Sequence, residues 1–146
     1  MPIIRKFKIE PFSAEQMYLL VNDVKTYPDY LPWCRATRIS NETLTSMTAA
    51  IQMSKGPLEK WFTTQNTLEY GQRIQLNLVD GPFRKLHGDW QFIEINPHEC
   101  QIKFELEFEF SFGMVGIMLE PIFHSIASTM VESFSARARQ IYKQSQ

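Results

Sequence analysis

The sequence predicts an α+β domain in which a curved antiparallel sheet of seven strands wraps around one long C-terminal helix. Residues 33–110 are apolar at every second position, in segments separated by turn-forming clusters. From residue 113 onward the apolar residues recur every three or four positions. A chain of 146 residues with 44% hydrophobic content is long enough for one core and short for two. We therefore expect a single domain spanning residues 1–146.

The N-terminal part predicts a strand followed by a helix. Residues Ile3–Glu10 alternate as expected for a strand near a sheet edge. Ser13 and Gln16 have the spacing of a capping box, which marks a helix N-terminus. The helix then has one apolar stripe, consisting of Met17, Leu20, Val21 and Val24. It should end at Tyr27, which precedes a proline, and leave room for a single turn or a very short helix before Trp33.

Six strands should follow this helix, because five turn-forming clusters interrupt the alternating pattern. The clusters are Asn41–Thr43, Lys55–Pro57, Tyr70–Gln72, Asp80–Pro82 and Asn96–Glu99. The last strand is the clearest: Ile102, Phe104, Leu106, Phe108 and Phe110 share one face, and Lys103, Glu105, Glu107 and Glu109 share the other. Strands joined by such short turns pair antiparallel, with one face buried and one in water.

The C-terminal segment predicts a long amphipathic helix. Its apolar stripe consists of Ile122, Ile126, Met130, Phe134, Ala138 and Ile141. Pro121 is either the first residue of this helix or a kink in a helix that begins at Met114, and we favour the kink. From Pro121 to Lys143 the helix would be roughly 34 Å long and would cross the concave face of the sheet. A curved sheet leaves a space beside such a helix, where we expect a ligand.

The charge and the cysteines limit the partners and the compartment. Fifteen Lys and Arg against sixteen Asp and Glu give a net charge of -1, which offers no support for binding DNA or RNA. Cys34 and Cys100 have no neighbouring metal-ligand motif, so we expect free thiols in a reducing, cytoplasmic setting. The longest apolar run, residues 112–119, is far shorter than the roughly 20 residues of a membrane-spanning helix.

No pattern typical of an active site is present. His87, His98 and His124 do not have the spacing of metal ligands. Glu94, Glu105, Glu107 and Glu109 alternate with apolar residues, as expected for an exposed sheet face rather than for a catalytic pair. Motifs for phosphate binding and for nucleophilic catalysis are missing. We expect a protein that is not an enzyme and holds no metal or cofactor.

The aromatic residues are the more informative signal. The chain has eleven Phe, five Tyr and three Trp. One group falls at loops and strand ends, namely Tyr27, Tyr30, Trp33, Phe83 and Trp90. Such a group is either ordinary core or the aromatic rim of a cavity that takes a flat apolar ligand, and we predict the rim.

Two stretches carry a family resemblance: residues 20–34, LVNDVKTYPDYLPWC, and residues 81–92, GPFRKLHGDWQF. A third is Phe108–Phe110, followed by residues 121–123. Together they resemble the bacterial ribosome-association toxins and their mitochondrial relatives, the coenzyme Q-binding START-like proteins, along essentially the whole chain. This resemblance implies the helix-grip fold. It also implies ubiquinone binding in support of respiration, or binding to the large ribosomal subunit that blocks 70S formation. It brings no catalytic residues.

Of these functions we favour a non-catalytic carrier that holds ubiquinone or a related prenyl lipid in the space between sheet and helix. The residues expected to contact this ligand are Tyr27, Trp33, Leu76, Leu78, Phe83, Trp90, Phe104, Phe108, Ile126 and Met130. The alternative for these residues is that they simply pack together. Peripheral contact with the inner membrane stays open for such a carrier, with residues 112–119 as the segment concerned.

Ribosome association is the alternative function. It should use the basic residues Arg84, Lys85, Arg137, Arg139 and Lys143, and the absence of net positive charge weighs against it. A polyketide cyclase-like enzyme ranks third, because the sequence lacks an acid-base pair.

Overall fold

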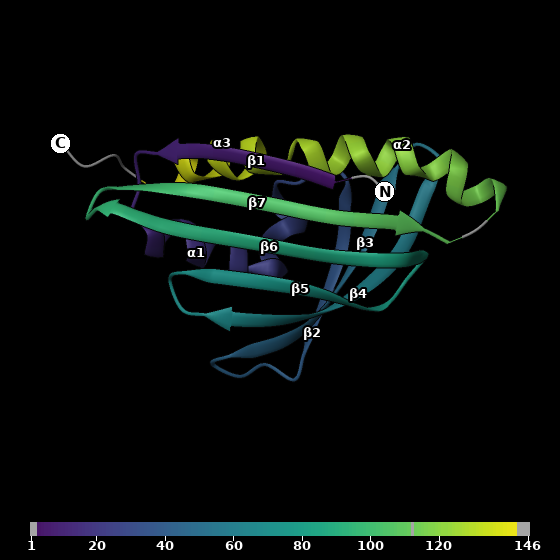
Figure 1. Ribbon diagram of the computed structural model, residues 1–146, viewed down its shortest axis with the longest axis horizontal. Coiled ribbons are helices and arrows are strands. Elements are labelled where there is room, and N and C mark those ends of the chain that lie inside the picture. Colours follow the sequence, from purple (N-terminus) through teal and green to yellow (C-terminus); the bar gives the residue numbers. More distant parts are fainter. Residues whose placement is uncertain (1–2, 112, 143–146) are drawn as a thin grey trace.

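Seven antiparallel strands form one sheet in the order β1-β7-β6-β5-β4-β3-β2 (Figure 1). The computed structural model describes residues 3–111 and 113–142. Its elements are β1 (Ile3–Glu10), α1 (Ala14–Asn22), the 3-10 helix η1 (Val24–Asp29), β2 (Cys34–Ser40), β3 (Ser46–Lys55), β4 (Leu58–Glu69), β5 (Arg73–Asp80), β6 (Phe83–Asn96), β7 (Glu99–Phe110), α2 (Met114–Ser128) and α3 (Met130–Ile141). Strands consecutive in the chain are neighbours, except that β1 pairs with β7. The predicted seven-stranded sheet with a C-terminal helix is confirmed.

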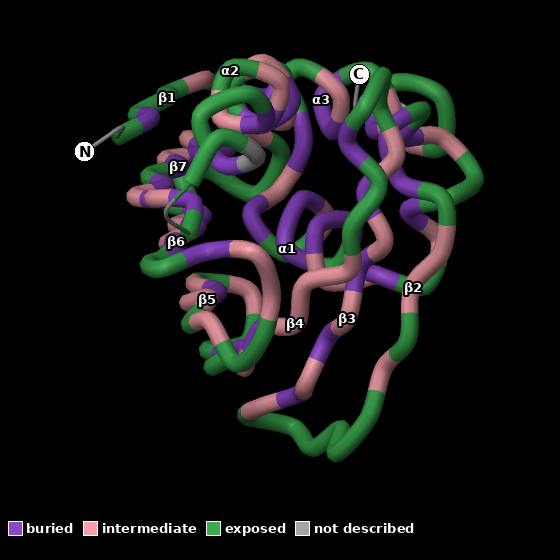
Figure 2. Tube along the Cα trace, turned by 90° about the vertical axis from the view of Figure 1, so that its right-hand side faces the viewer, coloured by how far each residue is buried: buried purple, intermediate pink, exposed green. Residues whose placement is uncertain are grey.

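The sheet is strongly curved, and the helices lie on its concave side. The end-on view in Figure 2 shows the strands bending around α1, with α2 and α3 closing the open side of the curve. Buried residues concentrate on the inner surface. On β7, for example, Ile102, Phe104 and Phe108 are buried at alternate positions. The period-two pattern of the sequence thus determines which face of the sheet meets the helices.

The C-terminal helix begins at Met114 with Pro121 inside it, as predicted, but it does not continue as one helix to its C-terminal end. Pro121 lies inside α2 and does not divide it, and the break occurs at Thr129, between α2 and α3. The hydroxyls of Ser128 and Thr129 donate to the carbonyls of Ser125 and Ile126, at 3.0 and 2.9 Å. Hydroxyl groups that bond back to the preceding turn bend helices. α3 ends at Ile141, and Lys143 lies outside the described residues.

The N-terminal helix begins where the sequence predicts and ends earlier. The Ser13 hydroxyl accepts a hydrogen bond from the Gln16 amide at 3.1 Å, and the Gln16 side chain accepts one from the Ser13 amide at 3.0 Å. α1 stops at Asn22, because Asp23 leaves the helical region of backbone conformation. Val24 and Tyr27, expected on the same helix, belong to η1 instead.

The aromatic residues form two groups within the core. At one end of the sheet, Phe83 packs against Phe110 and Phe123, with ring centroids 4.5 and 4.9 Å apart. Elsewhere, Trp90 stacks on Phe104 at 4.1 Å and contacts the edge of Phe134. Phe83 and Trp90, which were expected at one rim, lie seven positions apart on β6 and pack in different aromatic groups. No helix among the described residues is both long and apolar enough to span a membrane.

Candidate functional site

An internal cavity of about 60 Å³ lies between the concave face of the sheet and the helices. Its walls come from α1, η1, α2, α3, strands β3 to β7 and the residue that precedes β2. Seven of the residues expected to contact a ligand line it: Tyr27, Trp33, Leu76, Trp90, Phe104, Ile126 and Met130. The fold thus brings together residues that span more than a hundred positions of sequence.

Three of the expected ligand residues are not among those that line this cavity. Phe83 and Phe108 belong to the aromatic group around Phe123. Phe108 is completely buried there, and the centroids of the Phe108 and Phe123 rings are 4.7 Å apart. Leu78 is half-buried on β5, where it pairs with Thr64. The sequence pattern places all three on the inner face, but it does not show how far along the sheet the cavity extends.

Three polar side chains outside the set expected to contact a ligand also line the cavity. Thr64 and Asn66 are buried on β4, and the Thr64 hydroxyl donates to the Asn66 side-chain oxygen at 2.6 Å. Both occupy inward positions of the alternating pattern between Phe62 and Leu68, so polar residues at expected apolar positions were the available signal. Asn22, at the end of α1, completes this set.

Gly88 sits on the inner face of β6, between two leucines of the lining. A Cβ atom at this position would lie 3.0 Å from Leu76 Cδ1 and 3.1 Å from Leu106 Cδ1. The absence of a side chain therefore lets both leucines lie over the strand. An inward glycine in an otherwise apolar strand was the signal for this close approach.

The cavity holds no charged side chain among the described residues that line it. Its one phenol, Tyr27, donates a hydrogen bond to the Val21 carbonyl. Burial raises the pKa of Tyr27 well above its ordinary value, and the neighbouring Tyr30, Cys34 and Asp23 raise it further. The phenol therefore stays protonated at neutral pH. These walls suit the binding of an apolar molecule rather than proton transfer.

The histidines and cysteines lie apart from the cavity lining. His87 is exposed, with Nδ1 2.9 Å from the Asn77 side-chain oxygen, and His98 and His124 are exposed too. Cys34 and Cys100 are free and buried, and burial raises their pKa values to about 11 and about 12. Within residues 3–111 and 113–142, no group of His, Cys, Asp and Glu could hold a metal ion.

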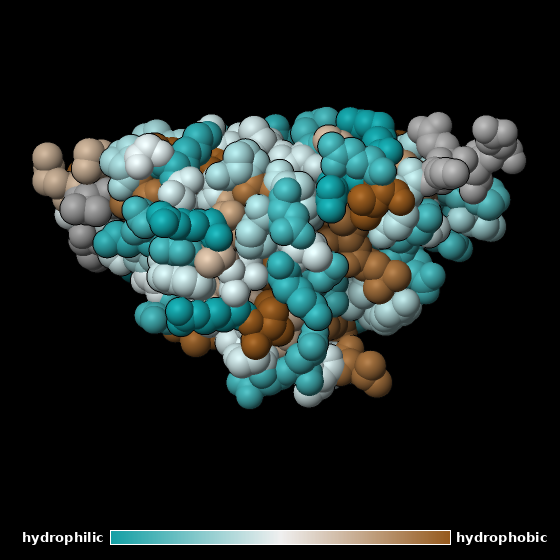
Figure 3. Space-filling view, turned by 180° about the vertical axis from the view of Figure 1, so that it is seen from behind, coloured by the Kyte–Doolittle hydropathy of each residue, from teal (hydrophilic) through white to brown (hydrophobic). Residues whose placement is uncertain are grey.

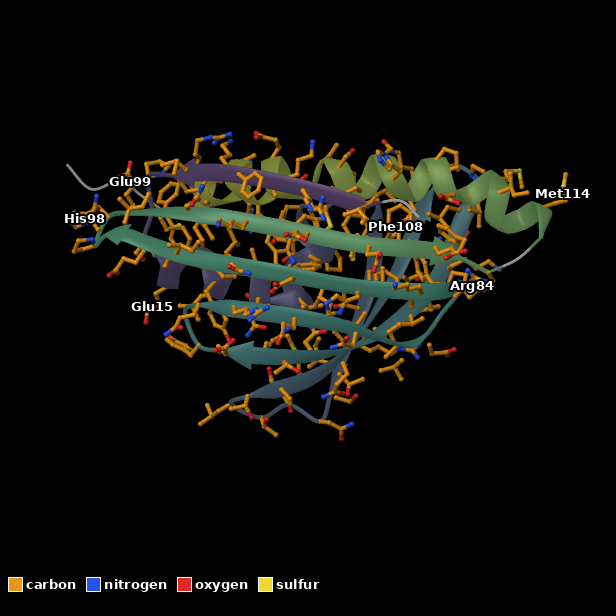
Figure 4. The ribbon with its side chains drawn as sticks, in the orientation of Figure 1. Glu15, Arg84, His98, Glu99, Phe108 and Met114 are labelled. Atoms are coloured by element: carbon orange, nitrogen blue, oxygen red, sulfur yellow. The ribbon has the colours of Figure 1, made fainter. Side chains whose placement is uncertain are left out.

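The basic residues expected to contact a partner lie in two places. Arg84 and Lys85 are on β6, where they form ion pairs with Glu109 at 2.5 Å and Glu107 at 2.9 Å. Arg84 lies at the same end of the molecule as Met114, and the β6–β7 turn with His98 and Glu99 lies at the opposite end (Figure 4). Arg137 and Arg139 are on α3. These four residues therefore do not form one basic surface.

Arg137 packs against an aromatic ring. Its guanidinium lies 4.8 Å from the centroid of the Tyr30 ring, and it donates to the Gln140 side chain at 3.2 Å. Arg139 is exposed and lies in the last turn of α3.

Comparisons with known proteins agree with the fold. The family model described as polyketide cyclase / dehydrase and lipid transport matches residues 11–135. The ribosome association toxin RatA of Escherichia coli is 45% identical over 142 residues, which cover 97% of this chain and 90% of that protein. The mitochondrial coenzyme Q-binding protein COQ10 homolog B of Xenopus laevis is 25% identical, covering 92% of this chain and 57% of that protein.

Among solved structures, the Zhui aromatase/cyclase from Streptomyces sp. R1128 superposes with a TM-score of 0.82. The match covers 95% of this chain and 94% of that one, at 13% identity, so it supports the fold alone. The match to RatA, by contrast, is both long and high in identity. The chain belongs to the RatA toxin family, within the polyketide cyclase / dehydrase and lipid transport family.

Proposed function

We propose that this protein associates with the large ribosomal subunit and blocks the formation of 70S ribosomes. The observation that carries this proposal is the 45% identity to RatA of Escherichia coli, which extends over 97% of the chain. The net charge of -1 weighs against this function, and the sequence alone favours a quinone carrier. The comparisons favour the ribosomal function, since the coenzyme Q-binding relative is far less similar.

The test is co-sedimentation of the purified protein with isolated large and small ribosomal subunits, followed by an assay of 70S formation. We expect the protein to sediment with large subunits, not with small ones, and to reduce the 70S fraction as its concentration rises. An unrelated protein of similar charge serves as the control. A 70S fraction that stays constant at saturating protein would contradict the proposal.

A second function, binding of a hydrophobic molecule in the internal cavity, is favoured by the cavity itself. Its lining is almost entirely aliphatic and aromatic, and the matching family model includes lipid transport in its description. The same uncharged lining supports binding without catalysis. Ubiquinone or a related prenyl lipid is the specific ligand that the coenzyme Q-binding relative suggests.

Thermal denaturation with and without a short-chain ubiquinone analogue tests this second function. A ligand that binds only the folded state raises Tm by mass action. We expect a Tm that increases with analogue concentration, and native mass spectrometry of protein purified without detergent should show the bound molecule. If Tm is unchanged by this analogue and by simple hydrocarbons, the cavity does not bind ligands of this class.

A further inference from the structure

The first turns of α2 are apolar on both of their faces. Gly116 and Leu119 are buried on the side of the sheet. On the other side, Met114, Ile117 and Met118 are 81%, 72% and 56% exposed, and their spacing places them together on one face of the helix. A helix that is apolar all round is typical of a segment covered on both sides. The sheet covers one side of these turns, and the other side is open to solvent.

The α2 tip, as we call Met114, Ile117 and Met118, is uncharged and projects from the molecule. Residues 113–119 include no Lys, Arg, Asp or Glu, and the first charged residue of the helix is Glu120. α2 extends past the ends of β6 and β7 (Figure 1). In the view from behind, hydrophobic side chains form this extremity, at the left edge (Figure 3). Exposed apolar groups that lie together mark contacts with other proteins or with membranes.

The size of the α2 tip favours a lipid surface over a protein partner. A stable protein interface uses about 20 to 30 residues on each partner and needs a complementary surface. The α2 tip offers three side chains, and the uncharged segment ends at Glu120. A bilayer needs no complementary surface, because each apolar side chain that enters it is stabilised separately. The flexible methionines adapt readily to such a fluid environment.

Behind the α2 tip, aromatic rings connect this end of the molecule with the internal cavity. Phe123, on the buried side of α2, contacts Phe83, Phe110 and Phe62, with ring centroids 4.9, 5.7 and 6.4 Å apart. Phe62 and Phe123 also line the cavity. A continuous set of apolar side chains therefore leads from the cavity lining to the end of the molecule at which the α2 tip is exposed. A bilayer in contact with the α2 tip would adjoin this set, which is the arrangement expected of a surface that meets an apolar phase.

We propose that the α2 tip docks this protein on a lipid bilayer, with its three side chains inserted at the boundary between headgroups and acyl chains. Residues 113–119 extend about 10 Å along the helix axis, and helices that bind at this boundary insert to a depth of roughly 5 to 10 Å. Gly113 provides no side-chain cap, so headgroup oxygens can accept hydrogen bonds from the first amides of the helix. This inference goes beyond both proposed functions, because it requires neither an occupied cavity nor a bound ribosome.

The absence of charge determines which lipids the α2 tip should bind. Two cations near this end of the molecule, Arg84 and Lys85, form ion pairs with Glu109 and Glu107. Docking should therefore depend on apolar insertion and not on attraction to anionic headgroups. We expect binding to zwitterionic vesicles, with little effect of salt. The ribosomal contact, by contrast, should weaken with salt, so the two kinds of binding are distinguishable.

The experiment measures sedimentation of the full chain with sucrose-loaded vesicles over a range of lipid concentrations, at low and at high salt. One set of vesicles is pure phosphatidylcholine, and the other is phosphatidylcholine mixed with phosphatidylglycerol. We expect the protein to bind both sets with affinities that agree within about twofold, because each inserted side chain gains the same transfer free energy in either. High salt should leave both affinities unchanged.

Matched double variants assign the binding to the α2 tip. Met114→Gln with Ile117→Gln should weaken binding to phosphatidylcholine by at least about tenfold, because two apolar side chains no longer enter the bilayer. Glutamine is a good helix former, so it should leave α2 intact. The control is Leu44→Gln with Ile95→Gln, which replaces two apolar side chains that are 92% and 49% exposed on other parts of the surface. The control should bind as the wild-type protein does.

A fluorescent reporter locates the contact independently of these variants. An environment-sensitive nitrobenzoxadiazole group attached at Met114→Cys should become brighter when phosphatidylcholine vesicles are added. The same group attached at Leu44→Cys should not change. Cys34 and Cys100 are buried, which protects them from the labelling reagent. If the double variant of the α2 tip does not fold, this measurement decides the question.

Four outcomes would overturn the inference. The first is a wild-type protein that does not bind phosphatidylcholine vesicles. The second is binding to anionic vesicles alone that disappears at high salt, since the contact would then be electrostatic. The third is an equal effect at the α2 tip and at the control positions, in either measurement. The fourth is a wild-type dimer in size-exclusion chromatography with light scattering that the α2 variant converts to a monomer, because a second copy would then cover the α2 tip.

Discussion

At the scale of single residues, the outer face of the sheet is stabilised by charge pairs, and the inner face is stabilised by packing. Arg73 and Asp89 form a bidentate ion pair across β5 and β6, with both N–O distances at 2.9 Å. Burial alone would raise the pKa of Asp89, but hydrogen bonds from Arg73 and Gln91 and the charge of Arg73 outweigh it and lower the pKa. The folded state therefore favours the ionised carboxylate.

Asp89→Asn should lower the free energy of unfolding by about 1 kcal/mol at pH 7. Because the pKa of Asp89 is lowered on folding, its contribution is present above the pKa of an unfolded aspartate, near 4, and is lost as the pH falls through the lower pKa of the folded protein. Urea denaturation of both proteins at pH 7 and at successively lower pH values measures this difference. A loss of stability that persists unchanged at the lowest pH would contradict the assignment. Glu59→Gln is the control, since Glu59 and Arg35 are both more than half exposed.

On the inner face, Phe108 tests whether an aromatic residue lines the ligand space or fills the core. Phe108 is completely buried against Phe123 and lies outside the cavity lining. Phe108→Ala should therefore destabilise the protein by roughly 3 to 5 kcal/mol, as for other truncations of packed aromatic residues. Urea denaturation measures it, with Phe7→Ala as the matched control, because Phe7 is 60% exposed. A loss below about 1 kcal/mol would show that empty space already adjoins Phe108.

At the scale of secondary-structure elements, local patterns predicted most of the fold. The capping box at Ser13 and the alternation along β7 both depend on neighbouring residues, and both are confirmed. The break at Thr129 was not predicted, because Pro121 is the stronger breaker by propensity and hydroxyl back-bonding is visible only once the helix is placed. The limits of the cavity were missed too, since they depend on which side chains meet across the sheet.

The capping box gives a prediction for α1. Ser13→Ala removes the hydroxyl that accepts from the Gln16 amide, and should destabilise the protein by about 1 kcal/mol. Ser13→Asp retains an acceptor for this hydrogen bond, so its stability should be close to that of the wild-type protein. Thermal and urea denaturation of the three proteins measure this. Equal loss in Ser13→Asp would show that the hydroxyl does not act as a cap.

At the scale of the whole molecule, charge is distributed unevenly over a protein of net charge -1. The outer face of β6 and β7 presents Glu105, Glu107 and Glu109, and two of these are paired with Lys85 and Arg84. Because Lys85 and Arg84 are paired with these glutamates, they attract a phosphate group less strongly. Arg137 and Arg139, on α3 at the other end of the sheet, are the better candidates for contact with ribosomal RNA (Figure 1).

The double variant Arg137→Gln, Arg139→Gln should therefore weaken binding to the large ribosomal subunit and reduce its salt dependence. If each arginine contacts one phosphate, the two contacts make the binding constant of the wild-type protein fall about tenfold between 50 and 200 mM salt. The double variant should lack this part of the slope of log K against log salt concentration. Co-sedimentation at several salt concentrations measures both effects. Arg35→Gln with Arg38→Gln removes the same charge from β2 and is the control. If the control loses binding and the α3 variant keeps it, the contact lies on the outer face of β2 and the assignment to α3 is wrong. Circular dichroism melting of each variant is needed as well, because Arg137 also packs on Tyr30.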